Sequence, residues 1–158
     1  MIVAPEHGRS FPQGKSRDIM TLQDELDHKD QWTKLSQQEL DEVLDKHEKF
    51  VNKQRDGERA QLGMHDLSYL DMAGRNLSRA ELTGGIPNYC NLEGAVMKNM
   101  DMEGADFWET DLRYADLSGS LLIDADLTDA DLRGTNLNDT DIRGTKGVPK
   151  KFEEDEAD

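Results

Sequence analysis

The sequence has few of the features on which disulfide-rich, secreted and membrane proteins depend. Its single cysteine, Cys90, excludes an internal disulfide and leaves the redox compartment open. No apolar run approaches the length of a membrane span, and the N-terminus lacks the apolar core of a secretory signal. We therefore expect a cytoplasmic protein.

Apolar and basic residues are scarce as well. Hydrophobic residues make up 35% of the chain, a composition typical of disorder unless the fold needs only a thin, regular core. The 34 acidic residues outnumber the 19 basic ones and leave a formal net charge of -15. Direct binding of nucleic acid through its phosphates is therefore not expected. An acidic chain is better suited to binding basic proteins or to mimicking the charge of DNA.

The N-terminal part of the chain divides into an arm and a helical region. Residues 1–20 contain Gly and Pro without periodicity and predict an extended arm. Residues 21–35 form a weak helical candidate, with Leu22 and Leu26 one turn apart and Trp32 and Leu35 following. We expect the whole of 21–59 to be a helical cap for the residues after it.

A stronger helix signal covers residues 37–56. Ser36 and Glu39 have the spacing of a capping box, in which each side chain satisfies an exposed backbone donor. Gly57 is a natural stop after this segment. One apolar stripe follows the helical spacing and consists of Leu40, Val43, Leu44, His47 and Val51.

From Ala60 to Gly144 the chain divides into seventeen five-residue units without an insertion. The first position is mostly small, the second is mostly Asp or Asn, and the third is large and apolar in every unit except at Pro87. A period of five fits neither a helix nor a flat strand, so each unit must be a short strand segment and a turn. Stacked units of this kind form an all-β solenoid.

This pattern resembles the pentapeptide-repeat family, whose unit is a small residue, Asp or Asn, Leu and two variable residues. The leader containing His47 and Phe50 also resembles the helical lead-in of small bacterial members. The resemblance implies a right-handed, four-sided parallel β-helix with four repeats per coil, here about four coils behind an N-terminal α-helical cap. It also implies that the first and third positions point inward and the other three point to solvent.

The ends of the repeat differ from each other. The helical region before Ala60 is the expected cover for one end, since an open solenoid end exposes unpaired strand edges. Residues 145–158 break the pattern and end in the acidic segment EEDEAD, so we expect a disordered tail and no strong C-terminal cap.

Apolar residues at outward positions are the candidate partner-binding site. Residues twenty apart stack in columns, so Tyr69 lies under Tyr89 and two adjoining faces carry the exceptions to the pattern. A clustered, exposed apolar patch usually marks a partner site. The six candidates are Tyr69, Ile86, Tyr89, Trp108, Leu121 and Ile123.

Two interpretations of this patch stay open. A separate protein or a second copy of the chain could bind it, or the N-terminal arm or the Trp32 segment could fold back over it. Pro87, with Gly84 and Gly85, predicts either a local bulge at the same place or a tolerated irregularity.

No catalytic, metal-binding or cofactor-binding site is expected. His47 lies on the helix stripe and Cys90 occupies an inward position, so both are interpreted as structural. His65 and Arg75 take inward positions in the first coil, where the cap could bond to them. The histidines have no metal-ligand spacing, and the repeated carboxylates lie on open faces without a pocket.

Three functions can be ranked on these grounds. The first is a non-catalytic protein–protein interaction scaffold or structural component that acts through the apolar patch. The alternative is a DNA-mimicking modulator of a DNA-binding enzyme such as DNA gyrase, as some family members are. The repeat has sixteen acidic and six basic residues, a net charge of -10, but it is short and lacks a C-terminal dimerising module. An enzyme ranks a distant third.

Overall fold

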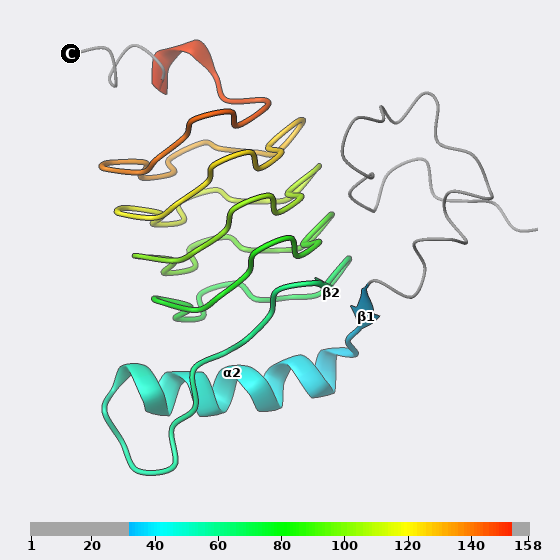
Figure 1. Cartoon of the computed structure of the whole chain (residues 1–158), viewed down its shortest axis with the longest axis vertical. Helices are drawn as coiled ribbons and strands as arrows, with labels where there is room; N and C mark the ends of the chain where they lie inside the picture. Colours follow the sequence, from blue (N-terminus) through cyan, green and yellow to red (C-terminus); the bar gives the residue numbers. More distant parts are fainter. Residues whose placement is uncertain (1–31, 153–158) are drawn as a thin grey trace, which may run out of the picture.

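The computed structural model describes residues 32–152 (Figure 1). Its elements are strand β1 (Thr33–Lys34), helix α2 (Gln37–Val51) and strand β2 (His65–Asp66). β1 pairs in parallel with β2, and the chain after β2 winds upward in stacked turns. The predicted arm 1–20, the first part of the cap region and the last six residues lie outside the described residues.

Backbone pairing between residues twenty apart builds the solenoid. Parallel bridges join second-position residues from Gln61↔Glu81 to Asp126↔Lys146. Within each bridge the third-position N–H donates to the second-position carbonyl nineteen residues on, as Leu67 does to Ile86 at 2.9 Å. Four units therefore form one twenty-residue coil. The strand segments are short because a turn interrupts the chain in every unit.

The turns require a left-handed backbone at the fifth position. In all seventeen units this residue has a positive φ, and seven of the seventeen are Gly. The N–H of the next residue donates back to the third-position carbonyl, as Leu70 does to Leu67 at 3.2 Å. A positive φ at this place in a four-residue turn defines a type II turn. The residue types at the fifth position are so varied that the repeat pattern alone does not reveal this requirement.

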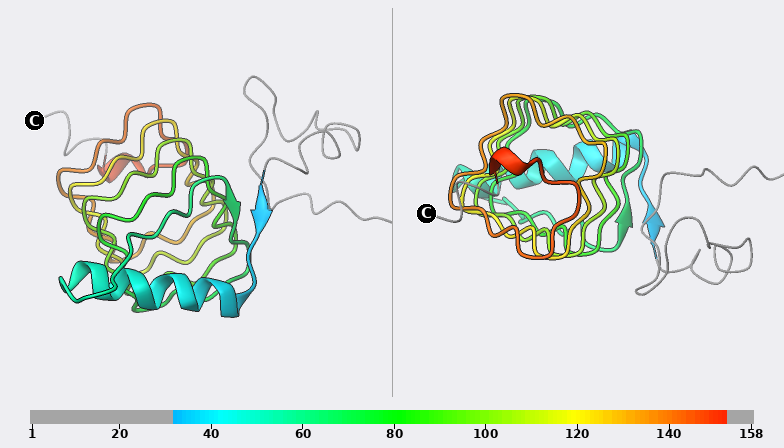
Figure 2. Two further views of the ribbon diagram at one scale, coloured as in Figure 1. Left: turned by 60° about the horizontal axis from the view of Figure 1, so that its bottom comes forward. Right: turned by 90° about the horizontal axis from the view of Figure 1, so that it is seen from above.

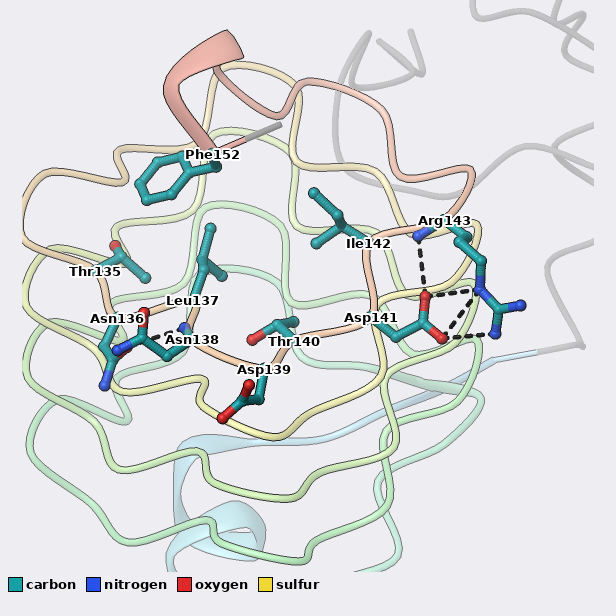
Figure 3. A pocket seen from close by; sticks show the side chains of 10 residues that line it. All are labelled: Thr135, Asn136, Leu137, Asn138, Asp139, Thr140, Asp141, Ile142, Arg143 and Phe152. Carbon is teal, nitrogen blue, oxygen red and sulfur yellow. Dashed lines mark hydrogen bonds and ion pairs between the residues drawn. The ribbon is translucent and has the colours of Figure 1, made fainter. Parts of the chain in front are cut away.

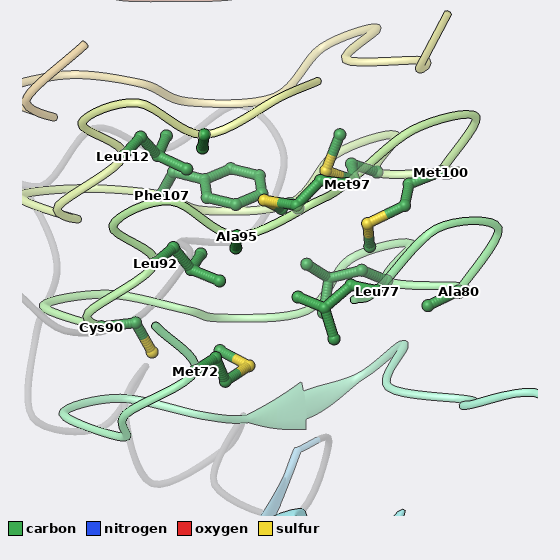
Figure 4. Close-up of a cluster of buried hydrophobic side chains, with 14 of the residues drawn as sticks. Met72, Leu77, Ala80, Cys90, Leu92, Ala95, Met97, Met100, Phe107 and Leu112 are labelled. Carbon is green, nitrogen blue, oxygen red and sulfur yellow. The ribbon is translucent and has the colours of Figure 1, made fainter. Parts of the chain in front are cut away.

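The first and third positions fill the interior. All third-position side chains up to Leu132 are buried. Figure 4 shows some of them, such as Leu77 and Leu92, beside small first-position residues such as Ala80 and Ala95. The Ser and Thr residues at first positions donate to a carbonyl twenty-three residues earlier, as Thr110 does to Pro87 at 2.7 Å. A hydroxyl can therefore enter the core without losing its hydrogen bond.

The second-position acids complete the turns. In thirteen units the Asp, Asn or Glu side chain accepts a hydrogen bond from the backbone N–H two residues on, as Asp111 does from Arg113 at 3.1 Å. This is an Asx-type turn, and carboxylates and amides form it well. Much of the acidity of the repeat therefore follows from the fold.

The predicted bulge at Pro87 is wrong. The pairing keeps its register on both sides, with Ile86 donating to His65 at 2.9 Å and Tyr89 donating to Trp108 at 3.1 Å. The bridges include Asp66↔Ile86 and Asp106↔Asp126 but none between Ile86 and Asp106. Proline has no N–H to donate, so its effect is a missing bond within an otherwise continuous ladder.

Helix α2 begins as the sequence predicts and ends earlier. Both bonds of the Ser36–Glu39 capping box are present. The predicted end near residue 56 is wrong, because the helix stops at Val51 and Lys53 adopts a left-handed φ of 56°. The weak helical prediction for 21–35 is also wrong in its described part, where Thr33–Lys34 is a strand.

Helix α2 lies across the first coil (Figure 2). Leu40 and Leu44 are fully buried against the solenoid core. Arg75 reaches from the first coil to Asp45 at 2.7 Å and Glu48 at 2.8 Å on the helix. These contacts place apolar packing and ion pairs between the helix and the start of the repeat.

His47 joins the helix to the first coil by two hydrogen bonds. Its Nδ1 accepts from the Ala60 N–H at 3.0 Å, so the neutral ring carries its proton on Nε2 and donates to the Ser78 carbonyl at 3.0 Å. Burial lowers the pKa of the ring from its ordinary value of 6.5.

The described residues after Gly144 are more ordered than expected. The repeat was predicted to stop at Gly144, but Lys146 still pairs with Asp126. Residues 150–152 form a helical turn that places Phe152 over an open hollow, with Leu137 and Ile142 below it (Figure 3). Residues 145–152 are therefore no disordered tail, and Phe152 with Val148 packs partly over the last coil.

We expect the free energy of unfolding to fall as the pH drops through 6.5. His47 takes up a proton there in the unfolded chain, whereas the buried ring of the folded protein stays neutral because its pKa is lowered. The free energy of unfolding should decrease by up to about 1.4 kcal/mol per pH unit until the folded ring is protonated. Urea unfolding at pH 7.5, 6.5 and 5.5 measures this, and His47→Gln is the matched control. An equal pH slope in both proteins would contradict the assignment.

Candidate interaction surface

Three aromatic rings meet on one face of the solenoid, here called the Tyr69 face and made of residues 65–69, 85–89, 105–109 and 125–129. Tyr69 and Tyr89 occupy fifth positions of successive coils and stack with centroids 4.8 Å apart and planes at 2°. Trp108 meets Tyr89 edge-on at 5.9 Å and 75°. Both arrangements are favourable for aromatic pairs. Stacking coils thus bring together three of the six predicted residues.

The two tyrosines occupy costly backbone positions. Their φ values are 68° and 57°, in the left-handed region that is an outlier for bulky residues. Such a conformation costs roughly 1–2 kcal/mol outside Gly, Asn and Asp. Tyr69 is nevertheless 67% exposed, so burial of its side chain does not offset that cost. A strained, exposed aromatic residue is a reason to look for a function.

Two of the predicted exposed residues are in fact buried. Ile86 is fully buried and Trp108 is 5% exposed, although both occupy outward positions. Part of the cover is the segment that contains β1. The Trp32 indole donates to the Gly84 carbonyl at 2.9 Å, and Lys34 Nζ donates to the Ser68 carbonyl at 2.6 Å. Ile86 and Trp108 are therefore removed from the accessible surface.

Leu121 and Ile123 lie apart from the ring cluster. They belong to the adjoining face, made of residues 60–64, 80–84, 100–104, 120–124 and 140–144, and Leu121 bridges Asp101 and Asp141 there. Leu121 is 39% exposed and Ile123 is half-buried. The six predicted residues therefore do not form one exposed patch.

Two further exposed residues lie outside the predicted set. Met64 and Tyr114 are 45% and 66% exposed, and both are fifth-position residues with φ near 60°. Tyr114 lies over Gly134, where an added Cβ would meet the ring at 2.5 Å. A large side chain where the turn favours Gly, Asn or Asp was the signal that could have identified them.

Arginines neutralise part of the acidic surface. Arg113 contacts Asp111 at 2.8 Å and Glu93 at 3.1 Å, and Arg133 contacts Asp131 at 2.6 Å. The hydrogen bond from Arg133 lowers the pKa of Asp131 to about 2. On this face, made of residues 90–94, 110–114 and 130–134, the second-position carboxylates are bound to arginine as well as to their own turns.

Cys90 has the environment of a structural thiol. It is 1% exposed and its Sγ–H donates to the Leu67 carbonyl at 2.8 Å. Burial raises the pKa of the thiol to about 12. In the described range 32–152, no three His, Cys, Asp or Glu residues are placed to hold a metal ion, and no helix there is long and apolar enough to cross a membrane.

The repeat identifies the family. The family model described as "Pentapeptide repeats (8 copies)" matches residues 90–129 and 110–146. Residues 90–146 therefore carry the repeat of the pentapeptide-repeat family, as their sequence predicted. No curated protein matches the chain.

Several solved structures are similar to parts of this chain. The pentapeptide repeat protein Rfr23 from the cyanobacterium Cyanothece 51142 is 30% identical over 56% of each chain, with a TM-score of 0.48. HetL from Nostoc sp. strain PCC 7120 is 31% identical over 53% of this chain and 42% of its own, with a TM-score of 0.32. The protein alr5209 from Nostoc PCC 7120 is 27% identical over 66% and 93%, with a TM-score of 0.46. This chain spans about half the length of the first two.

We expect Cys90 to be inert in the folded protein, because a thiol with a pKa of about 12 forms little thiolate at pH 8. Labelling with an aromatic disulfide reagent should be at least about 100-fold slower in buffer than in 6 M guanidinium. Rapid labelling of the folded chain would contradict the buried environment.

We expect Tyr69→Gly to change the free energy of unfolding by less than about 1.5 kcal/mol. Gly relieves the left-handed strain, and this offsets the lost stacking on Tyr89, which is worth about 0.5–1.5 kcal/mol. Urea unfolding measures the difference. Ala at the same position removes the ring but keeps the strain, so Tyr69→Ala should be less stable than Tyr69→Gly. The reverse order would contradict the presence of strain at this turn.

Proposed function

We propose that the protein is a non-catalytic interaction scaffold whose partner binds the stacked pair Tyr69 and Tyr89. The observation that supports this best is Tyr69 itself, which is two-thirds exposed in a backbone conformation that disfavours large residues. Aromatic residues on a rigid support contribute strongly to protein interfaces, because little side-chain freedom is lost on binding.

The scaffold we propose is a right-handed, four-sided β-helix of about four coils, with α2 as its N-terminal cap. The buried Leu40, Leu44 and His47 and the Arg75 ion pairs support that role for the helix. A capped solenoid presents the tyrosine pair without end-to-end association through unpaired strand edges. A cytoplasmic location stays a prediction from the sequence.

DNA mimicry is the second candidate, and the net charge of -10 on the repeat is the observation in its favour. The use of thirteen second-position side chains in their own turns weakens it, because the fold alone accounts for those residues. The bound arginines also lower the density of free negative charge.

We expect the double variant Tyr69→Gly with Tyr89→Gly to lose its partner while staying folded. Native cross-linking followed by affinity purification from the source cells identifies what the wild-type chain binds, and titration of that purified partner measures Kd. Kd should rise at least about tenfold in the double variant. Tyr114→Gly, at an equivalent turn on another face, is the matched control.

Equal binding by the double variant and the wild type would contradict the role of the tyrosine pair. A supercoiling assay with purified gyrase separates the two candidates. Inhibition at stoichiometric protein that persists in the tyrosine double variant would favour DNA mimicry, whereas no inhibition would support the scaffold.

A further inference from the structure

The Tyr69 face contains outward-pointing side chains that no longer reach solvent. Six residues at second and fourth positions of this face are buried, namely Asp66 at 8%, Ser68 at 5%, Ile86 at 0%, Asn88 at 0%, Asp106 at 1% and Trp108 at 5%. The equivalent positions on the other faces are exposed or half-buried, as Glu103 and Arg133 are exposed. Something besides the solenoid itself must cover this part of the face.

Within residues 32–152, the segment held on this face by hydrogen bonds is Trp32–Leu35. Its backbone bonds to Met64 and Asp66, and its side chains bond to Ser68 and Gly84. All four of these residues belong to the first coil or to the start of the second. Asp106 and Trp108 lie one coil further along, beyond those contacts.

We propose that residues 7–17 of this chain cover Ile86, Asp106 and Trp108. This stretch, HGRSFPQGKSR, contains Arg9, Lys15, Arg17 and Phe11 and no acidic residue, in a chain whose net charge is -15. The face it would cover offers carboxylates at Asp106, Glu109, Asp126 and Asp129 beside an indole ring. Cations pair with the carboxylates there, and an apolar ring packs on the indole.

The chain is long enough to reach this position. Fourteen residues, 18–31, separate Arg17 from Trp32. An extended chain spans roughly 3.3 Å per residue, whereas adjacent coils are about 4.8 Å apart. Residues 7–17 can therefore lie across the second to fourth coils with slack in the connection.

Cover at this place limits what a partner can contact. Ile86 and Trp108 are removed from the surface, while Tyr69 stays 67% exposed at the margin. Trp108, held under the arm, in turn supports Tyr89 edge-on. This cover is independent of the proposed function, because it concerns the buried residues of the face and not the exposed tyrosine pair.

Disulfide trapping in the full chain tests the proposal. In a Cys90→Ala background, Phe11→Cys is combined with Glu109→Cys on the Tyr69 face and, as the matched control, with Asp139→Cys on the opposite face. Glu109 and Asp139 are both exposed fifth-position residues with φ of 52° and 58°. Mild oxidation and non-reducing gels then separate internally linked monomers from linked dimers.

An internally linked monomer that forms at least about tenfold faster with Glu109→Cys than with Asp139→Cys would support the proposal. Equal rates at the two positions would overturn it, because the arm would then have no fixed place. Linked dimers at Glu109→Cys, without linked monomers, would also overturn it and would assign the cover to a second copy.

A second measurement needs no new cysteine. Trp32→Phe leaves Trp108 as the single tryptophan, and acrylamide quenching of its fluorescence reports its access to solvent. Adding Arg9→Glu, Lys15→Glu and Arg17→Glu should raise the quenching constant severalfold. The matched control carries Lys49→Glu, Lys53→Glu and Arg55→Glu on the exposed cap region. It changes the net charge by the same amount and should leave the quenching constant unchanged. An unchanged constant in both triple variants would overturn the proposal.

Discussion

The backbone pairing between residues twenty apart is the constraint on which the rest of the structure depends. It requires every unit to turn through the same angle, and the left-handed fifth position supplies that turn. The second-position carboxylate or amide then bonds the backbone two residues on, and the third-position side chain fills the axis. The second, third and fifth positions are therefore determined by the turn and the core, and the first position, which is mostly small, also points into the interior.

Because the fold requires these residues, they say little about function. The acidic character of the repeat illustrates this, since most second-position acids serve their own turns and several also bind arginine. The informative residues are those that the turn disfavours. Met64, Tyr69, Tyr89 and Tyr114 all place large side chains in a left-handed conformation, and Tyr69 and Tyr114 are largely exposed. Function is best sought where a side chain persists against the local backbone preference.

The Tyr69 face shows why a regular repeat does not imply a regular surface. Its second and fourth positions have the same backbone geometry as those of the other faces, yet Ile86 and Trp108 are buried on it. The β1 segment pairs with β2 at the edge of this face and bonds to Ser68 and Gly84. A segment outside the repeat thus lies against part of this face, so the repeat pattern alone does not show which of its residues are accessible. The stacked tyrosines remain at the margin of the covered area.

The sequence alone determined the repeat, its register, its resemblance to the pentapeptide-repeat family, the inward first and third positions and the start of α2, because all of these depend on local spacing. It also placed Tyr69 under Tyr89, since a strict period puts residues twenty apart in one column. Tertiary structure decided the burial of Ile86 and Trp108 and the packing of Phe152 over the last coil. Both depend on contacts between segments far apart in the chain, and a five-residue pattern carries no information about such contacts.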